Sequence, residues 1–260
     1  MNISLLDKTA LICGSTQGIG LAIAKELAQL GAQCILLARN EQSLKEAVAS
    51  LHPVAKAHEY RVVDFNNNEA VKTVAAGIAR SFTIHILVNN TGGPPPGPVA
   101  DASAEAFTAA FNQHIVNYQQ LTQAVLPGMK QAGYGRIINI VSTSVKIPIA
   151  NLGVSNTIRA ATAGWAKTLA NEVAGWGITV NNILPGYTKT QRLDSLITNN
   201  ASRQQIGKEE LAAKMQQQIP AKRFGEPEEI ASVAAFLASP AASYVNGVNL
   251  AVDGGNTGAF

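Results

Sequence analysis

The chain has 260 residues, of which 47% are hydrophobic and only 14% are charged, and its formal net charge is +3 at pH 7. This length is ordinary for a single α/β unit, and the apolar content supplies a sizeable core. The basic residues are dispersed, which excludes the clustered Lys and Arg of a nucleic-acid-binding surface. Because globular proteins average about 25% charged residues, this low charge predicts that sister subunits cover part of the surface.

Short apolar runs alternate along the chain with longer segments of helical period. The runs are rich in Val, Ile and Leu without polar alternation, which is typical of strands buried on both faces of a parallel sheet. Strands are predicted over residues 9–13, 33–38, 58–63, 84–89, 135–141, 178–183 and 247–251. Helical periodicity is clearest over residues 18–30, 155–174 and 226–238. The alternation predicts a single domain over residues 1–260, a doubly wound parallel sheet of the Rossmann type.

The two cysteines, Cys13 and Cys34, lie in apolar runs that are typical of buried strands. No Cys/His spacing matches a metal site, so no metal is predicted. The first residues lack the basic segment and apolar stretch of a secretory leader, and no apolar run reaches the roughly 20 residues of a membrane span. We therefore expect a reduced, cytoplasmic protein without a membrane partner.

A glycine-rich segment follows the first predicted strand and opens the first predicted helix. Its glycines have the spacing G-x3-G-x-G, which lets the backbone turn tightly and approach a pyrophosphate. The start of the helix adds free N–H groups and a favourable dipole for the phosphates. The segment therefore predicts a dinucleotide site formed by Gly14, Ser15, Thr16, Gln17, Gly18, Ile19 and Gly20.

Further segments follow the later strands in a characteristic order. Asp64-Phe65 follows the third strand, Asn89-Asn90-Thr91-Gly92 follows the fourth, and Pro185-Gly186 follows the sixth, with Thr188 and Thr190 beyond it. Val252-Asp253-Gly254-Gly255 comes near the end. With these motifs the whole chain resembles the short-chain dehydrogenase/reductase family, most closely its 3-oxoacyl-carrier-protein-reductase-like members. A homotetramer or homodimer is implied by the same resemblance.

The resemblance also implies a cofactor site beyond the glycine loop. Its members would be Asp64, Phe65, Asn90, Thr91, Gly92, Pro185, Gly186, Thr188 and Thr190. Asp64 would meet the adenine amino group, although the residue alone favours a turn or cap. Asn90 and Gly92 would line the ribose and nicotinamide, and the two threonines would hold the carboxamide.

The end of the second strand predicts which dinucleotide is bound. An NAD site places Asp or Glu there to bind the ribose hydroxyls, but this chain has Ala38 followed by Arg39. A carboxylate would repel a 2′-phosphate, whereas a guanidinium pairs with one. NADP(H) is therefore predicted over NAD(H). The alternative is that Arg39 is simply an exposed residue leading into a helix.

The family's chemistry uses Asn, Ser, Tyr and Lys, and only one of the four is retained. Ser142 matches the serine, His114 falls at the asparagine position, and Ser155 and Arg159 fall at the positions of Tyr and Lys. A serine hydroxyl is a far weaker acid than a phenol and sits on a shorter side chain. Arg159 remains protonated, so it can hold ribose hydroxyls but cannot relay a proton. This pattern predicts a weak enzyme unless another group supplies the proton.

Two other side chains are candidate proton donors. Tyr187 follows Pro185-Gly186, and His114 has an imidazole that can titrate near neutral pH. For each there is an alternative: Tyr187 packs against the nicotinamide or lines the pocket, and His114 hydrogen-bonds inside the helix layer. Ser155 has an alternative too, as the N-cap of its helix.

Two segments without catalytic residues have two interpretations each. Residues 190–218 are rich in Gln, Asn, Lys and Arg, and form either an inserted helical lid or a solvated helix pair. Residues 92–98 are rich in Gly and Pro, and form either a stiff wall of the substrate pocket or a rigid surface loop.

The sequence as a whole predicts an NADP(H)-dependent oxidoreductase acting on a carbonyl or alcohol of a small molecule. The alternative is a catalytically silent dinucleotide-binding sensor or partner subunit.

Overall fold

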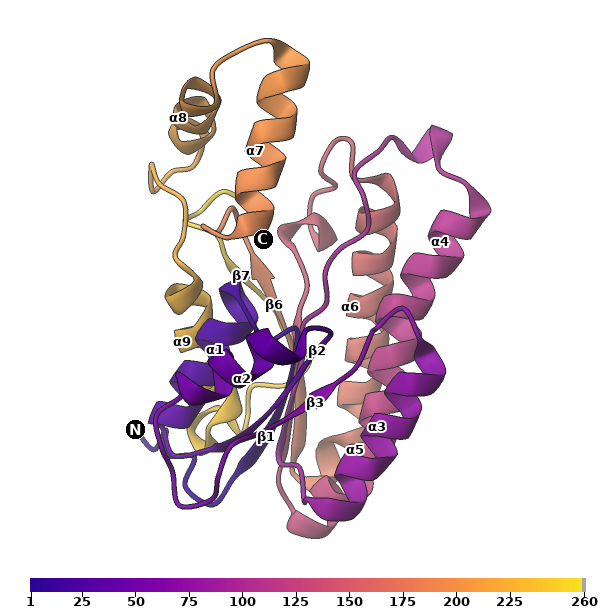
Figure 1. Ribbon diagram of the computed structural model, residues 1–260, viewed down its shortest axis with the longest axis vertical. Helices are drawn as coiled ribbons and strands as arrows, with labels where there is room; N and C mark the ends of the chain where they lie inside the picture. Colours follow the sequence, from indigo (N-terminus) through magenta and orange to yellow (C-terminus); the bar gives the residue numbers. More distant parts are fainter. Residues whose placement is uncertain (259–260) are drawn as a thin grey trace.

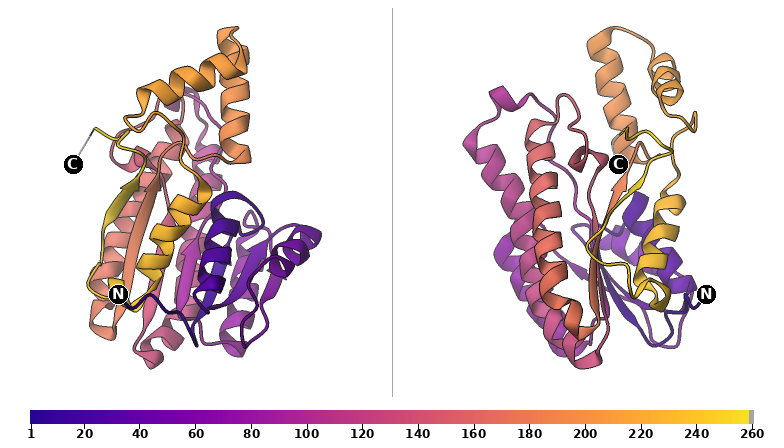
Figure 2. Two further views of the ribbon diagram at one scale, coloured as in Figure 1. Left: turned by 90° about the vertical axis from the view of Figure 1, so that its left-hand side faces the viewer. Right: turned by 180° about the vertical axis from the view of Figure 1, so that it is seen from behind.

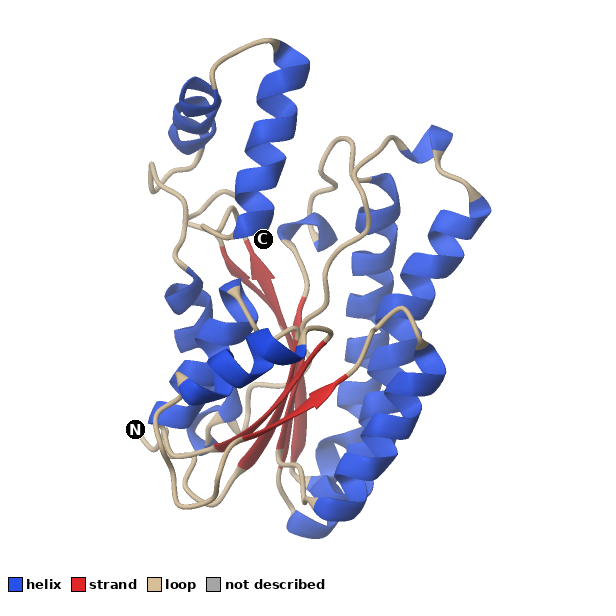
Figure 3. Ribbon diagram, in the orientation of Figure 1, coloured by secondary structure: helices blue, strands red, loops and turns tan. Residues whose placement is uncertain are grey.

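A parallel sheet with helices on both faces forms the centre of the computed structural model, which describes residues 1–258 (Figures 1 and 3). Its strand order is β3-β2-β1-β4-β5-β6-β7, so the order reverses between β1 and β4. The strands are β1 (Thr9–Cys13), β2 (Gln33–Ala38), β3 (Glu59–Val62), β4 (Ile86–Asn89), β5 (Gly135–Ile140), β6 (Ile178–Pro185) and β7 (Asn249–Val252). Ligands of such sheets bind where the order reverses, at the carboxyl ends of the strands. The predicted fold class is confirmed.

The sheet differs from the prediction mainly at its edges. Every residue of β1, β2, β4 and β5 is buried, but the edge strands β3 and β7 are only partly covered, because each has a neighbour on one side only. β3 and β4 begin later than predicted. Just before these strands the side chains of His58 and His85 take the place of backbone partners. The Nδ1 atoms accept hydrogen bonds from the N–H groups of Cys34 in β2 and Thr9 in β1.

Two helical layers enclose the two cores. One layer contains α1 (Gly18–Gln29), α2 (Glu41–Ala49) and α9 (Pro227–Ala238), and the other contains α3 (Asn68–Ser81), α4 (Ala104–Phe111), α5 (Asn117–Ala132) and α6 (Gly153–Val173). One apolar cluster fills the space under each layer. Cys13 and Cys34 lie in these clusters, and burial raises the pKa of both thiols to about 12, so both are unreactive. Within residues 1–258, no helix is long and apolar enough to cross a membrane.

Residues 190–218 fold as two helices above the carboxyl ends of the strands (Figure 2). They are α7 (Gln191–Gln204) and α8 (Lys208–Gln218). Beneath them lies a separate apolar cluster of Leu193, Ile197, Ala201, Leu211, Ile219 and Phe224. The pair is therefore packed around its own small core and is more than a solvated surface feature. Whether it closes over a ligand remains a prediction.

Candidate functional site

The glycine loop between β1 and α1 is packed so closely that there is no room for a side chain at Gly14 or Gly20. Gly14 and Gly18 have positive φ angles of 58° and 52°, which favour glycine. A Cβ on Gly14 would lie 2.4 Å from the carbonyl oxygen of Asn90, and one on Gly20 would lie 2.1 Å from that of Gly14. Asn90 Nδ2 donates to the carbonyls of Cys13 and Gly14 at 3.3 and 3.1 Å. The loop is thus fixed to the end of β4.

The start of α1 fits the phosphates of a dinucleotide. Its N-cap, Gln17, makes no side-chain cap, and its first turn has no acidic residue, so the N–H groups are free for an anion. A cavity of about 310 Å³ lies between α1 and the start of α9, and its polar lining includes Gln17, Lys25, Lys189, Thr190 and Glu228. The residues present therefore match the phosphate-binding end of the predicted cofactor.

The loop after β6 borders the same end of the sheet. Thr190 is the N-cap of α7, and its methyl group would lie 3.1 Å from a Cβ on Gly18. Thr190 Oγ1 donates to the carbonyl of Thr188, which is buried. Gly186 donates its N–H to the carbonyl of Val252, which ties Pro185-Gly186 to the end of β7. The structure thus brings Thr190 next to the glycine loop, whereas Gly186 packs against Asp253 after β7.

The residues predicted at the adenosine end lie after β2 and β3. Arg39 is exposed, and none of the carboxylates of residues 1–258 lies within 4.0 Å of its guanidinium. The cap of α2 is provided by Asn40, which accepts from Ser43 N at 2.8 Å, so Arg39 has no capping role. Asp64 accepts two hydrogen bonds from Asn66, as expected of a turn residue, and it remains exposed. The adenine contact of Asp64 stays a prediction.

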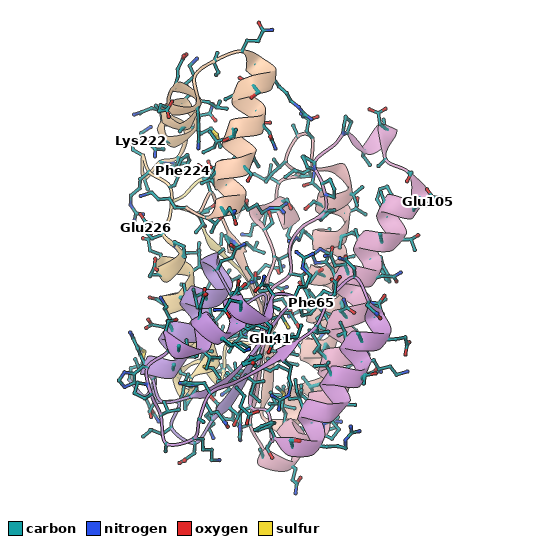
Figure 4. The ribbon with its side chains drawn as sticks, viewed as in Figure 1. Glu41, Phe65, Glu105, Lys222, Phe224 and Glu226 are labelled. Carbon is teal, nitrogen blue, oxygen red and sulfur yellow. The ribbon has the colours of Figure 1, made fainter. Side chains whose placement is uncertain are left out.

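Phe65 follows in a buried position, which Figure 4 shows near the middle of the molecule. Its carbonyl accepts a hydrogen bond of 2.7 Å from Asn117 Nδ2, at the start of α5. Phe65 therefore links the loop after β3 to the helix that carries the next group of polar side chains.

Ser142 and Ser155, which the resemblance aligns with the family's Ser and Tyr, lie in different environments. Ser142, after β5, is partly exposed, and its Oγ accepts a hydrogen bond of 3.1 Å from Ser144 N. Ser155 is only 5% exposed. The helix α6 begins at Gly153 with Leu152 as its N-cap, so the alternative that Ser155 caps the helix is wrong.

The proline-rich loop 92–98 covers the start of α6. Gly97 N donates to Asn151 O at 2.7 Å, and Gly153 N donates to Gly97 O at 3.0 Å. A Cβ on Gly153 would lie 2.6 Å from the backbone of Val99. This close packing fixes the start of α6 against the loop.

His114 lies in a π turn, Asn112–Val116, that interrupts one long helix between α4 and α5. Such turns displace backbone groups and often occur at functional sites. Here the Asn112 carbonyl accepts a hydrogen bond of 2.9 Å from Asn68 Nδ2 on α3. The turn directs both His114 and Tyr118, four residues later, into the protein interior, where both are fully buried.

The imidazole of His114 is held in its neutral form. Nδ1 is 2.8 Å from Thr91 Oγ1, and Nε2 has no hydrogen-bond partner among the described residues. Burial, followed by the charges of Arg159 and Arg192, lowers the pKa of His114 to about 3. An imidazole with this pKa is not protonated near neutral pH. The structure therefore places His114 in the hydrogen-bonding role that was its alternative.

Tyr118 is the polar residue that sequence reasoning missed. Its hydroxyl is 2.8 Å from Thr91 Oγ1 and 3.4 Å from His114 Nδ1, and the whole side chain is 0% exposed. Burial raises the pKa of Tyr118, and the nearby charge of Arg159 opposes that rise. The spacing of four from His114, which puts both on one helix face, is the signal that could have found it.

Arg159 reaches the same group of side chains from α6. It is 7% exposed, Nη1 donates to Ile140 O at 2.9 Å, and Nε is buried without a partner among residues 1–258. Burial lowers the pKa of its guanidinium, which still remains charged near neutral pH. A phenol and a cation are thus neighbours in this chain. They come from two helices, α5 and α6, instead of one.

Tyr187 is directed toward the lid. Its ring packs edge-on against Phe224, with centroids 6.2 Å apart, and it contacts the apolar cluster beneath α7 and α8. Figure 4 shows Phe224 beneath α8. Burial raises the pKa of Tyr187, so it is a poor acid where it stands. No group of three or more metal-ligating side chains occurs within residues 1–258.

Comparisons with known proteins agree with this arrangement. The profile of the family described as enoyl-(acyl carrier protein) reductase matches residues 14–257. The chain belongs to the short-chain dehydrogenase/reductase family. It is 34% identical over 257 residues to the NADPH-dependent reductase BacG of Bacillus subtilis, covering 96% of this chain and 97% of BacG.

Two solved structures are similar over nearly the full length. The chain matches YwfH, an NADPH-dependent reductase involved in bacilysin biosynthesis, with a TM-score of 0.90, 31% identity and coverage of 97% and 99% of the two chains. It matches L-sorbose reductase of Gluconobacter frateurii, crystallised with NADPH and L-sorbose, with a TM-score of 0.93, 32% identity and complete coverage of both chains. The chain thus retains the fold of these relatives over nearly its whole length.

Proposed function

We propose that this short-chain dehydrogenase/reductase uses NADP(H) to interconvert a carbonyl and an alcohol on a small molecule. The observation that carries the proposal is the buried phenol of Tyr118 beside the guanidinium of Arg159, next to an intact glycine loop. NADPH, when bound, supplies a hydride. The proposal is supported by the NADPH-dependent relatives named above.

The residues of this chain are suited to hold NADP(H). The free N–H groups at the start of α1 would bind the pyrophosphate, and Asn90 and Thr188 border the nicotinamide end. Arg39 would pair with the 2′-phosphate, since β2 ends without a carboxylate and none lies close to its guanidinium. These features favour NADP(H) over NAD(H), in agreement with the sequence prediction.

Tyr118 is the proposed source of the proton. Its hydroxyl is fully buried and contacts Thr91 Oγ1, so its proton would pass to the Thr91 hydroxyl, which would give up its own proton to the substrate oxygen. Arg159 favours the phenolate that forms when the proton leaves, and neutral His114 holds the hydroxyl group in position. Ser142, which is partly exposed, would orient the substrate oxygen. Arg159 would also hold ribose.

Two matched variants test the proton donor. Tyr118→Phe removes only the hydroxyl, so we expect the turnover of a carbonyl panel to fall roughly 100- to 10,000-fold. The Kd for NADPH should stay unchanged, because Tyr118 is not near the phosphate end. Tyr187→Phe is the control and should retain turnover within about threefold, because its hydroxyl lies at the base of the lid. The opposite ranking of the two variants would contradict the proposal.

One observation favours a second function, binding without turnover. Tyr118 is 0% exposed, so the phenol itself has no contact with the space outside the helix layer. A sensor or partner subunit would bind NADPH, show no turnover on any substrate of the panel, and behave the same after Tyr118→Phe. The two functions are therefore separated by the same pair of measurements.

A homotetramer or homodimer is the proposed assembly. It is supported by the low charge of the chain and by the half-covered edge strand β7, where Leu250 is 37% exposed. Light scattering at micromolar concentration would test it, and a monomer would contradict it. The cytoplasmic location stays a prediction.

A further inference from the structure

Arg192 joins the lid to the loop that follows β4. It is the second residue of α7, and its Nη1 donates to the carbonyl of Gly93 at 3.2 Å. A Cβ on Gly93 would lie 2.7 Å from Nη2 and 3.1 Å from Cζ, so the guanidinium lies directly against this glycine. The side chain of Arg192 is exposed to solvent, and the part of it that packs against the loop is desolvated enough to lower its pKa. This position, one residue beyond Gly92, borders the end of the site where the reacting groups meet.

Among the described residues, Arg192 and Arg159 place positive charge in this region without a carboxylate beside either guanidinium. Its charge acts on both His114 and Arg159 and lowers the pKa of each, so the two guanidinium groups lie within electrostatic reach of one another. Within residues 1–258, no carboxylate lies within 4.0 Å of either guanidinium. Arg159 is buried whereas Arg192 is exposed, so an anion arriving from solvent can reach the Arg192 guanidinium and relieve the repulsion between the two charges.

Two of the three carboxylates of the lid pair with lysines of the lid, and the third, Glu209, lies on α8 and forms no ion pair with Arg192. Asp194, two residues after Arg192, pairs with Lys208 at 2.6 Å, and Glu210 pairs with Lys214 at 2.6 Å. The lid therefore leaves the positive charge of Arg192 without a nearby counter-ion. Arg159 adds a buried Nε that also has no partner among the described residues.

We propose that Arg192 binds a carboxylate of the substrate, so that the natural substrate is an oxo acid or the corresponding hydroxy acid. This inference rests on the proposed function and names its substrate class. A guanidinium pairs with a carboxylate through two parallel hydrogen bonds, and one such pair fixes the orientation of the ligand. Arg159 contributes to the positive field.

A cofactor phosphate is the other anion that Arg192 could meet. The phosphate groups, however, are provided for by the start of α1 and by Arg39, next to β1 and β2. Arg192 instead contacts the loop after β4, and its charge acts on His114 and Arg159. The structure therefore favours the substrate carboxylate, and the experiment distinguishes the two.

The test uses 2-, 3- and 4-oxo acids of four to ten carbons, each paired with its methyl ester. With NADPH, the unaltered protein should reduce at least one acid with a kcat/KM roughly 10- to 100-fold above that of its ester. Arg192→Gln should abolish this preference by raising KM for the acid. Arg203→Gln, which removes an exposed arginine from the same helix, is the control and should keep the preference.

Calorimetry of the same acids with the protein saturated with NADP⁺ gives a readout without turnover. The inference is supported if an acid binds and Arg192→Gln weakens that binding while the Kd for NADPH stays unchanged. If such an acid binds but no acid is reduced, only the proposed function fails. Reduction of acids and esters with equal kcat/KM overturns the inference but leaves the proposed function intact. The inference is also overturned if no acid binds, or if Arg192→Gln weakens NADPH instead.

Discussion

The two ends of the site are built by different means. At the cofactor end the contacts are made by backbone, in a loop where Cβ atoms on Gly14 or Gly20 would approach carbonyl oxygens to 2.4 or 2.1 Å. At the catalytic end they are made by side chains, and the phenol beside the cation comes from α5 instead of α6. A backbone site tolerates no change at its glycines. A side-chain site can be rebuilt from another helix that reaches the same place.

The largest effect is expected at the glycine loop. Gly14→Ala would place a Cβ 2.4 Å from the carbonyl oxygen of Asn90, at a φ of 58° that strains any residue with a Cβ. The loop must shift to accommodate it, so we expect the affinity for NADPH to fall at least roughly 100-fold, or about 2.7 kcal/mol. A fluorescence titration with NADPH measures this loss.

The control for this variant is Gly77→Ala in α3. A Cβ on Gly77 would meet only the end of the Arg80 side chain, at 3.9 Å. This variant should bind NADPH normally and gain up to about 1 kcal/mol of helix stability. If Gly14→Ala bound NADPH as tightly as Gly77→Ala, the loop would not be the close-fitting backbone site described here.

The next effect tests the buried side chains of the catalytic end through pH. The pKa of His114 is about 3 in the folded protein, below the value of about 6.5 expected in the unfolded chain. The unfolded chain therefore binds more protons between these values, so stability is fully present above pH 6.5 and is lost as the pH falls toward 3. At pH 5 the loss should be about 2 kcal/mol.

Urea unfolding of His114→Asn over pH 4.5–8 measures this dependence. The variant lacks the buried imidazole, so its free energy of unfolding should fall less than that of the unaltered protein by about 2 kcal/mol at pH 5. His52→Asn, which replaces an exposed histidine, is the control and should leave the slope unchanged. Equal slopes for His114→Asn and the unaltered protein would mean that His114 is not held neutral by burial.

The sequence predicts the cofactor end better than the catalytic end for the same physical reason. The glycine loop is local: its spacing, the strand before it and the helix after it together determine its shape. The neighbours of Arg159 come from segments far apart in the chain, since Thr91 follows β4 and Tyr118 lies on α5. The helix pattern contained no sign of the π turn that directs Tyr118 inward. The role of Arg192 could not be predicted from the sequence either, because Arg192 and Gly93 are 99 residues apart in the chain.

The smallest effect is expected from Arg39, an exposed side chain at the cofactor end. Arg39→Ala removes the proposed partner of the 2′-phosphate but leaves the backbone contacts, so the affinity for NADPH should fall roughly 10- to 30-fold. NADH, which lacks that phosphate, should bind the variant and the unaltered protein equally well. Lys45→Ala, which removes a positive charge from the exposed Glu41–Lys45 pair on α2, is the control and should leave both affinities unchanged. Tighter binding of NADH than of NADPH by the unaltered protein would contradict the role of Arg39 and would leave its exposed guanidinium as a solvated surface group.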